Sequence, residues 1–190
     1  MNFPASITLE SDSHATAVIS LGSNQASVFG SPVETLLQAM ERLQGLTESV
    51  GLVSSLYLSE PIDCPAETAH FINAIVCLQL PKSSSPDALL RAMQAIESSF
   101  GRRRDSTPQD LPINLPRTLD LDLICFGNQL LSSDFLTLPH PRAHQRRFVL
   151  EPLAEIAPQL VLPAQNLPVE ELLRLLSDSQ TVRRISRGNY

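Results

Sequence analysis

Apolar residues recur along the chain with two different spacings, and these spacings predict strands and helices in a regular order. Alternating or unbroken apolar runs predict four strands, at residues 15–21, 50–58, 71–80 and 119–126. Apolar residues at helical spacing, each series introduced by a Ser-Pro pair, predict helices at residues 32–44 and 86–100. The order strand-helix-strand-strand-helix-strand is that of a split βαβ unit.

The fourth predicted strand carries two acidic residues, Asp120 and Asp122, which period two places on one face about 7 Å apart. The other face is then apolar, with Leu119, Leu121, Leu123 and Cys125. Carboxylates on a buried strand need partners, and their oxygens suit a hard cation such as Mg²⁺. Arg117, just before them, offers a planar fork that suits phosphate. The strand therefore indicates phosphoryl transfer, with simple ion pairs to nearby arginines as the alternative.

Four other polar features each allow a structural and a functional interpretation. Gly22-Ser23-Asn24 is either a plain turn after the first strand or backbone close to a ligand. Asn73, inside an apolar strand, either bonds a neighbouring loop or reads the edge of a heterocycle. The arginines at 102–104 either complement a helix end or bind an anion. His140, between two prolines, is either structural or a phosphate contact beside the arginines at 142, 146 and 147.

The rest of the chain predicts shorter elements. Residues 105–116 hold three prolines without periodicity, which is typical of a binding loop or lid. Gly127-Asn128 predicts a hairpin, with residues 130–131 and 136–138 as its flanks. Two further helices are predicted, at 148–156 and 169–176, before a basic tail. We expect three segments: a flexible tail at 1–14, one domain at 15–162, and a helix and tail at 163–190 packed on that domain.

Composition narrows the class of protein. With 43% hydrophobic and 18% charged residues, the chain is typical of a soluble globular protein. A net charge of −6 argues against general nucleic-acid binding. Three scattered cysteines without C-x-x-C spacing predict no disulfide framework or zinc site and fit the reducing cytoplasm. The start does not resemble a signal peptide, and apolar runs are too short to span a membrane, so we expect no membrane partner.

The familiar phosphate-binding loops are missing from the sequence. It contains neither G-x-x-x-x-G-K-[ST] nor G-x-G-x-x-G. Side chains and metal must therefore hold the phosphates. The sequence also suggests no Ser-His-Asp or Cys-His arrangement, so direct transfer from a nucleotide to an acceptor is expected rather than a covalent intermediate.

Several of these motifs together resemble a known family, the hydroxymethyldihydropterin pyrophosphokinases of folate biosynthesis. The resemblance rests on Arg117-Thr118-Leu119-Asp120-Leu121-Asp122, then Leu138-Pro139-His140-Pro141-Arg142, then Arg146-Arg147-Phe148-Val149-Leu150. Ser20-Leu21-Gly22-Ser23-Asn24, Phe71-Ile72-Asn73-Ala74, Ile96-Glu97 and Gly101-Arg102-Arg103-Arg104 follow the order found in the family. The match covers roughly residues 15–158.

The resemblance implies a ferredoxin-like α+β sandwich with a C-terminal extension, acting as an enzyme. It would transfer pyrophosphate from ATP, the co-substrate, to 6-hydroxymethyl-7,8-dihydropterin, leaving AMP. Two Mg²⁺ ions would be held by Asp120 and Asp122, and Arg104 and Arg117 would act on the phosphates. The other implied ATP contacts are Gln94, Glu97, His140 and Arg146. The implied pterin contacts are Ser59, Pro61, Ile62, Phe71, Asn73 and Phe148.

The sequence departs from the family pattern at two places. The family often has a tryptophan in the loop before the arginine, where this chain has Asn114, and a tyrosine where it has Phe71. The first change bears on closure of the loop rather than on the chemistry, and the second keeps the stacking ring but loses a hydroxyl. A non-catalytic relative that binds nucleotide or pterin is the alternative function. We expect a monomer in the cytoplasm.

Overall fold

The structure is a computed structural model that describes residues 7–49, 51–61, 68–102, 116–177 and 180–186. Among these residues, no helix is long and apolar enough to cross a membrane.

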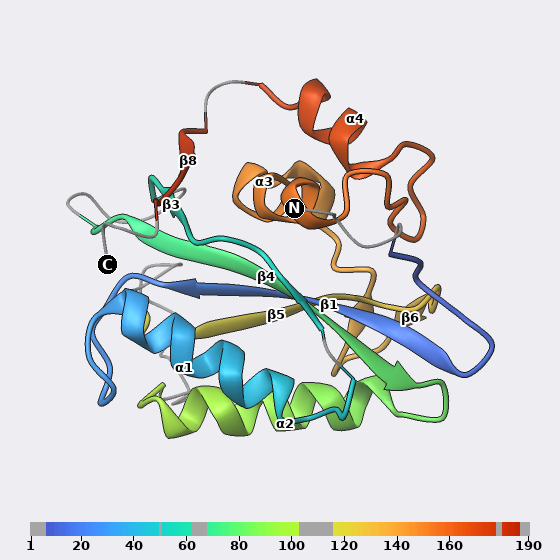
Figure 1. Cartoon of the computed structure of the whole chain (residues 1–190), viewed down its shortest axis with the longest axis horizontal. Helices are drawn as coiled ribbons and strands as arrows, with labels where there is room; N and C mark the ends of the chain where they lie inside the picture. Colours follow the sequence, from blue (N-terminus) through green and yellow to red (C-terminus); the bar gives the residue numbers. More distant parts are fainter. Residues whose placement is uncertain (1–6, 50, 62–67, 103–115, 178–179, 187–190) are drawn as a thin grey trace.

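One antiparallel sheet forms the centre of the molecule (Figure 1). Its strands lie in the order β5-β1-β4-β3-β8, and β2 also pairs with β4. The bounds are β1 (His14–Ser23), β2 (Leu52–Val53), β3 (Tyr57–Ser59), β4 (Phe71–Pro81), β5 (Asp120–Phe126) and β8 (Val182–Arg184). Apart from β8, this is the strand order of a split βαβ fold, so the predicted ferredoxin-like α+β class is confirmed.

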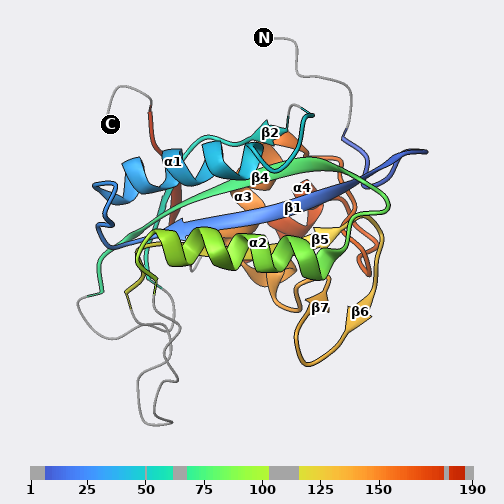
Figure 2. The ribbon, with the colours of Figure 1, turned by 90° about the horizontal axis from the view of Figure 1, so that it is seen from below.

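Helices cover both faces of the sheet. The two early helices, α1 (Pro32–Gln44) and α2 (Pro86–Ser99), lie on one face, where Figure 2 shows them side by side. On the other face α3 (Arg147–Ile156) packs on the sheet, and α4 (Val169–Leu175) packs on α3 (Figure 1). Each early helix begins where the sequence predicts. The Ser31 side chain forms a capping box with Glu34, and the Ser85 hydroxyl accepts a hydrogen bond from Ala88 N.

Each face of the sheet therefore has its own hydrophobic core. Alternate residues of β1 show the division: Ile19 and Leu21 pack against α1 and α2, whereas Val18 packs on the α3 side. Ile75 of β4 and Ile124 of β5 join Val18 in the second core. Both faces are buried because the strands carry apolar residues at nearly every position.

A β-bulge changes the face of one predicted residue. Strict alternation predicts Cys125 on the same face as Leu123, but Cys125 packs with Val18 on the α3 side. The register between β1 and β5 shifts here, because Val18 lies opposite Cys125 whereas Ile19 lies opposite Leu123, which leaves Ile124 as the extra residue. Asp120 and Asp122 come before the shift and keep their common face.

The predicted strand at 50–58 is two short strands rather than one. Val53 pairs with Val76 of β4 and Tyr57 pairs with Asn73, so residues 54–56 lie opposite only residues 74–75. This extra residue interrupts the strand pairing, beginning at Ser54. The hydroxyl of Ser54 accepts a hydrogen bond from Ile75 N at 2.9 Å, and Ser54 N donates to Ile75 O at 2.9 Å. These bonds hold the two pieces on β4 despite the break.

The elements after β5 differ from the prediction in two ways. The predicted flanks do pair, as β6 (Leu131–Ser132) and β7 (Thr137–Leu138), but Gly127-Asn128 is the turn that ends β5 and does not join them. The connection between β6 and β7 is residues 133–136. A short 3₁₀ helix, η1 (Ala143–Gln145), then leads into α3. The basic tail contains β8, which the sequence pattern does not predict.

Candidate active site

A cavity of about 430 Å³ lies on the α3 side of the sheet, beyond the end of the second core. On this face of the sheet, the inward-facing positions carry apolar core residues in the middle of the strands. Towards the cavity the same face carries polar or small residues. In β1, Ser20 and Gly22 follow Val18, and in β5, Asp122 and Asp120 precede Ile124. The lining consists of Ser20, Gly22, Ser59, Glu60, Phe71, Asn73, Arg102, Arg117, Asp120, Asp122, His140, Arg142, Gln145, Arg146, Phe148 and Gln180.

The turn after β1 fixes the start of β5. Asn24 exchanges two hydrogen bonds with Arg117, accepting from Arg117 N through Oδ1 at 2.8 Å and donating its own N–H to Arg117 O at 3.2 Å. The Ser23 hydroxyl donates to Thr118 O at 2.6 Å. The Gly22-Ser23-Asn24 turn thus holds the backbone from which Arg117 reaches into the cavity.

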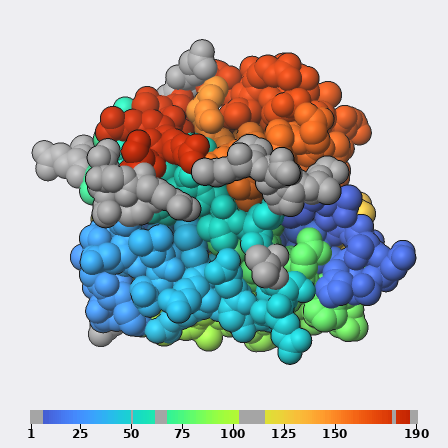
Figure 3. Space-filling model, viewed as in Figure 1, coloured from blue at the N-terminus to red at the C-terminus, as the bar shows by residue number. Residues whose placement is uncertain are grey.

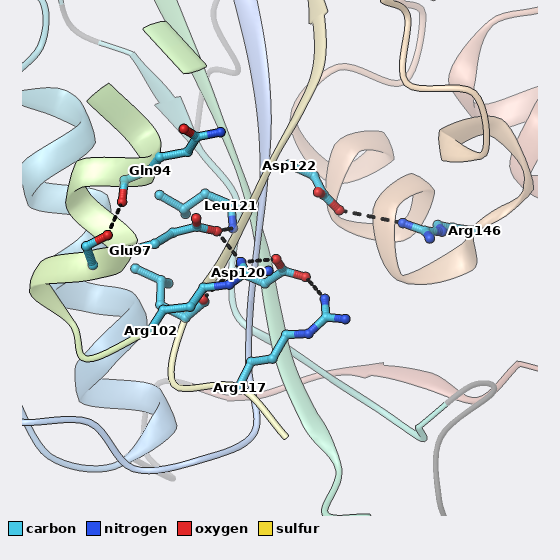
Figure 4. Close-up of polar contacts among 10 residues, drawn as sticks. Gln94, Glu97, Arg102, Arg117, Asp120, Leu121, Asp122 and Arg146 are labelled. Atoms are coloured by element: carbon cyan, nitrogen blue, oxygen red, sulfur yellow. Dashed lines mark hydrogen bonds and ion pairs between the residues drawn. The ribbon is translucent and has the colours of Figure 1, made fainter. Parts of the chain in front are cut away.

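Asp120 lies between two arginines (Figure 4). Its Oδ1 contacts Arg102 Nη1 and its Oδ2 contacts Arg117 Nη1. Burial acts to raise the pKa of Asp120, but the two guanidinium groups outweigh it and hold that pKa below its usual value. Asp120 is therefore ionised near neutral pH.

Asp122 has a different electrostatic environment. Arg146 Nη1 lies 3.6 Å from its Oδ2, on the opposite side from Arg102 and Arg117 (Figure 4). Burial and the neighbouring charge of Asp120 raise the pKa of Asp122 to about 6. The guanidinium of Arg146 also lies over the ring of Phe148, 5.4 Å from its centroid. Arg146 thus connects the acidic part of the cavity with its aromatic part.

His140 is held by its backbone at the edge of β5. Its N–H donates to Ile124 O at 2.8 Å, and its Nδ1 accepts from Arg142 N at 3.2 Å. The peptide bond before the preceding proline, Leu138–Pro139, is cis. Burial, with Arg146 and Arg142 nearby, lowers the pKa of His140 to about 4, so the ring is neutral at pH 7.

The far end of the cavity offers a flat apolar ring beside a buried amide. Phe71 begins β4, and Asn73 follows it on the same face with a side chain that is 3% exposed. Asn73 Nδ2 donates to the hydroxyl of Ser59 on β3 at 2.9 Å. Phe148 comes from α3 on the other side. Aromatic side chains with a few fixed polar groups suit a planar polar heterocycle.

A second cavity of about 280 Å³ adjoins the first, since Asp122 and His140 line both. Gln94 lines this second cavity, and in Figure 4 its side chain points away from Asp120. Glu97, one turn later on α2, is 1% exposed and binds Arg102 through Oε1, which also accepts from Leu121 N at 2.9 Å. Gln94 and Glu97 therefore face different surroundings, although their spacing places them on one side of α2.

The two aspartates are suited to Mg²⁺ as part of a larger ligand set. Asp122 carries a half-buried charge that its surroundings offset poorly, as its raised pKa indicates. In the part of the chain that the structure describes, no third His, Cys, Asp or Glu joins the pair in a group that could hold a metal. Mg²⁺ commonly takes one or two carboxylates and completes its shell with water and phosphate oxygens. The pair therefore fits a cation that arrives with a phosphate ligand.

The structure brings most of the predicted site residues together. Nine of them line the larger cavity: Ser59, Phe71, Asn73, Arg117, Asp120, Asp122, His140, Arg146 and Phe148. Gln94 lines the smaller one, whereas Glu97 and Pro61 are not among the described residues that line either. Ile62, Arg104 and most of the 105–116 loop lie outside the described residues.

The structure also adds residues that the sequence analysis did not assign. Arg102 contacts both Glu97 and Asp120, whereas the family resemblance implies a role for Arg104 of the same run. A buried glutamate near the end of α2 could have indicated it, since such a charge needs a partner close by. Gln180 lines the cavity from the tail, and no signal in the sequence points to it.

Comparisons with known proteins agree with this geometry. The family model described as 7,8-dihydro-6-hydroxymethylpterin-pyrophosphokinase (HPPK) matches residues 18–158. A 2-amino-4-hydroxy-6-hydroxymethyldihydropteridine pyrophosphokinase of Haemophilus influenzae is 35% identical over 88% of this chain and 97% of its own length. The protein of the same name from Pseudomonas aeruginosa is 41% identical over 79% of this chain and 86% of its own.

A crystal structure of an HPPK-DHPS in complex with substrates has the same fold, with a TM-score of 0.61 at 12% identity. The alignment covers 84% of this chain and 44% of the other, so this chain spans less than half the length of that protein. The fold, the family model and the two bacterial relatives agree, and they confirm the family predicted from the sequence motifs. The chain belongs to the 7,8-dihydro-6-hydroxymethylpterin-pyrophosphokinase family.

Proposed function

We propose that the chain transfers the pyrophosphoryl group of ATP to 6-hydroxymethyl-7,8-dihydropterin, releasing AMP, as a step of folate biosynthesis. One observation carries the proposal: a single cavity joins a pair of acids flanked by arginines to an aromatic pocket with a buried amide. The first part suits the phosphates of a magnesium nucleotide, and the second suits a flat heterocycle. Family membership supports the same activity.

The pterin binds at the aromatic end in this proposal. Phe71 and Phe148 stack on its two faces, and Asn73 hydrogen-bonds to its polar edge. The bond from Asn73 Nδ2 to Ser59 fixes the orientation of that amide before the substrate arrives. Pro61 and Ile62, which follow β3 in the sequence, contribute backbone contacts to the pterin.

The nucleotide extends from the smaller cavity into the larger one. Gln94 contacts the nucleoside end, and His140 and Arg146 contact the phosphates where the two cavities adjoin. Because His140 is neutral at pH 7, it offers a phosphate oxygen an N–H donor rather than a full charge. Arg104, which follows α2 in the sequence, binds the phosphates. Glu97 acts through Arg102, which it orients.

Asp120 and Asp122 would hold the two Mg²⁺ ions that accompany the ATP phosphates. When bound, these ions would neutralise the charge on the phosphate oxygens. Arg102 and Arg117 both contact Asp120 and both line the cavity, so they hold Asp120 in place before the substrates bind. Their guanidinium groups are also placed to contribute to phosphate binding.

The reaction is an in-line displacement at the β-phosphorus. The hydroxymethyl oxygen forms a bond to the β-phosphorus, and the bond from that phosphorus to the oxygen shared with the α-phosphate breaks. AMP leaves with that oxygen, and the hydroxyl proton passes to water. Arg117 and Arg102 stabilise the charge on the transferred group, and the two phenylalanines hold the pterin so that its hydroxymethyl group faces the phosphates.

The proposal includes the expected organisation of the chain. Residues 15–162 form the catalytic domain, and 163–190 pack on it, which is supported by the contacts of α4 with α3 and of β8 with β3. We place the enzyme in the cytoplasm, whose reducing conditions fit three scattered cysteines without C-x-x-C spacing. We propose that the enzyme is a monomer, and light scattering tests this.

Product analysis tests the function directly. Purified protein with ATP, Mg²⁺ and the hydroxymethyl pterin is expected to form AMP and the pterin pyrophosphate in equal amounts. Asp120→Asn and Asp122→Asn, which keep the side-chain shape, are expected to abolish turnover. ADP as the product, or phosphate released without the pterin, would reject the proposal. ATP binding in calorimetry without turnover would instead favour a non-catalytic relative.

A further inference from the structure

The C-terminal strand lies against the strand that forms one wall of the cavity. β8 pairs antiparallel with β3, with Val182 opposite the cavity residue Ser59. Two backbone hydrogen bonds, of 2.8 and 3.4 Å, extend the pairing at its ends: Ile185 N to Leu56 O and Glu60 N to Thr181 O. In Figure 3 the C-terminal part of the chain, orange to red, forms the upper half of the face shown, above the blue to cyan N-terminal half.

A carboxylate of α3 anchors this strand. Glu155, whose side chain is 17% exposed, forms an ion pair with Arg184 of β8 at 3.1 Å. The same carboxylate accepts from Ser55 N at 2.7 Å, from the Ser55 hydroxyl at 2.8 Å and from the Tyr57 hydroxyl at 3.3 Å. Glu155 of α3 is thus bonded to β8 through Arg184, to β3 through Tyr57, and to Ser55 just before β3. The position of β8 is therefore tied to those of β3 and α3.

Gln180, shortly before β8, reaches from the tail to the start of α3. Its Oε1 accepts a hydrogen bond from Arg147 N at 2.9 Å, and its Nε2 lies 3.4 Å from Gln145 O. Arg147 is the first residue of α3, and the preceding Arg146 makes no side-chain capping bond. The first N–H groups of a helix have no partner within the helix, so Gln180 supplies an acceptor that the local sequence lacks.

The residue that Gln180 holds stands between two cavity residues. Arg146, before it, faces Asp122, and Phe148, after it, presents its ring to the cavity. We propose that Gln180 is a positioning residue for Arg146 and Phe148, and that β8, anchored by Arg184 and Glu155, holds it in place. The inference rests on the proposed function, in which Arg146 and Phe148 contact the substrates.

Steady-state kinetics of Gln180→Ala provide the first test. Loss of the bond to Arg147 N is expected to raise the KM for both the pterin and ATP about fivefold, with kcat nearly unchanged, since the bond orients binding groups rather than reacting atoms. Gln180→Glu keeps the acceptor and is expected to restore the KM. Gln159→Ala, which removes an exposed glutamine bonded to Glu170 at 2.7 Å, is the matched control. An unchanged KM in Gln180→Ala, or no rescue by glutamate, would overturn the inference.

A double-mutant cycle tests the role of β8. Arg184→Ala is expected to raise the pterin KM in the wild-type background but to add little in Gln180→Ala, because both changes act through one contact. Arg183→Ala removes the same charge from the neighbouring exposed position and is expected to leave the KM unchanged. Independent, multiplying effects of Arg184→Ala and Gln180→Ala would contradict the coupling.

The amide of Arg147 provides a readout that needs no turnover. In an amide exchange experiment by NMR, the Arg147 N–H is expected to exchange faster in Gln180→Ala than in wild type, and to stay protected in Gln180→Glu. If wild-type protein formed no AMP, the proposed function would fail, while this measurement would still decide whether Gln180 holds α3. Equal exchange in wild type and Gln180→Ala would overturn the inference alone.

Discussion

Glu97 and Arg102 form an ion pair at the end of α2, and the guanidinium nitrogen that contacts Glu97 also contacts Asp120. The Glu97 side chain is 1% exposed, whereas that of Arg102 is 19% exposed and reaches the cavity. A fully buried charge thus positions an arginine that the substrates can reach.

Removing Glu97 is expected to lower the stability of the folded protein. Glu97→Ala leaves Arg102 partly buried without that partner and Leu121 N without its acceptor, so we expect the free energy of unfolding to fall by about 3 kcal/mol. Glu97→Gln can keep the bond to Leu121 N and should cost less. Urea denaturation measures both, with Glu41→Ala on the exposed side of α1 as the control. Wild-type stability in Glu97→Ala would show that the ion pair contributes nothing.

Asn24 is expected to control Arg117 from outside the cavity. Asn24→Ala removes the acceptor of Arg117 N and the donor to Ala69 O, and should destabilise the protein by about 2 kcal/mol. Because the start of β5 then loses one of the three hydrogen bonds that hold it to this turn, kcat is expected to fall as well. The control is Asn128→Ala, in an exposed turn. Normal kcat in folded Asn24→Ala would mean that Arg117 does not depend on this contact.

Phe71 is expected to contribute through its ring. Phe71→Leu keeps an apolar side chain but loses the stacking surface, so the KM for the pterin should rise about five- to tenfold while the KM for ATP stays constant. Phe71→Tyr keeps the ring and should behave like the wild type. If the leucine variant bound the pterin normally, or if the KM for ATP rose equally, the pterin would have to lie elsewhere.

His140 is expected to titrate far below an ordinary histidine. Its pKa of about 4 in the folded protein, against 6.5 for an ordinary histidine, means that the unfolded chain binds more protons between these values. His140 therefore contributes stability above pH 6.5 that is lost as the pH falls towards 4. NMR titration of the ring protons, assigned with His140→Gln, measures this pKa. A midpoint near 6.5 would show that burial and the arginines do not act on the ring.

The split βαβ order could be predicted because apolar periodicity and Ser-Pro starts agree along the first 126 residues. The acidic face of β5 could be predicted for the same reason, since Asp120 and Asp122 precede the bulge. The position of Cys125 could not, because one extra residue in β5 reverses the alternation and leaves no mark in an unbroken apolar run. The break between β2 and β3 also comes from one extra residue, which the apolar pattern of residues 50–58 does not reveal.

Contacts between distant segments account for most of what the sequence left open. β8 has few apolar residues and is a strand because β3 offers it a free edge. Gln180 gains its place from that pairing, so its neighbours in the sequence could not indicate it. The run of three arginines predicts that one of them pairs with an acidic residue. Identifying Arg102 as that residue requires knowing where α2 ends relative to Asp120.

The claim that the rest depends on is that Asp120 and Asp122 bind divalent cations together with nucleotide phosphates. Anomalous diffraction from crystals containing Mn²⁺, a non-hydrolysable ATP analogue and the pterin tests it most directly. We predict anomalous density within coordination distance of both carboxylates, with at least one of Arg102 and Arg117 turned to a phosphate oxygen. Both acids still paired with these arginines, with no anomalous density beside them, would contradict the account.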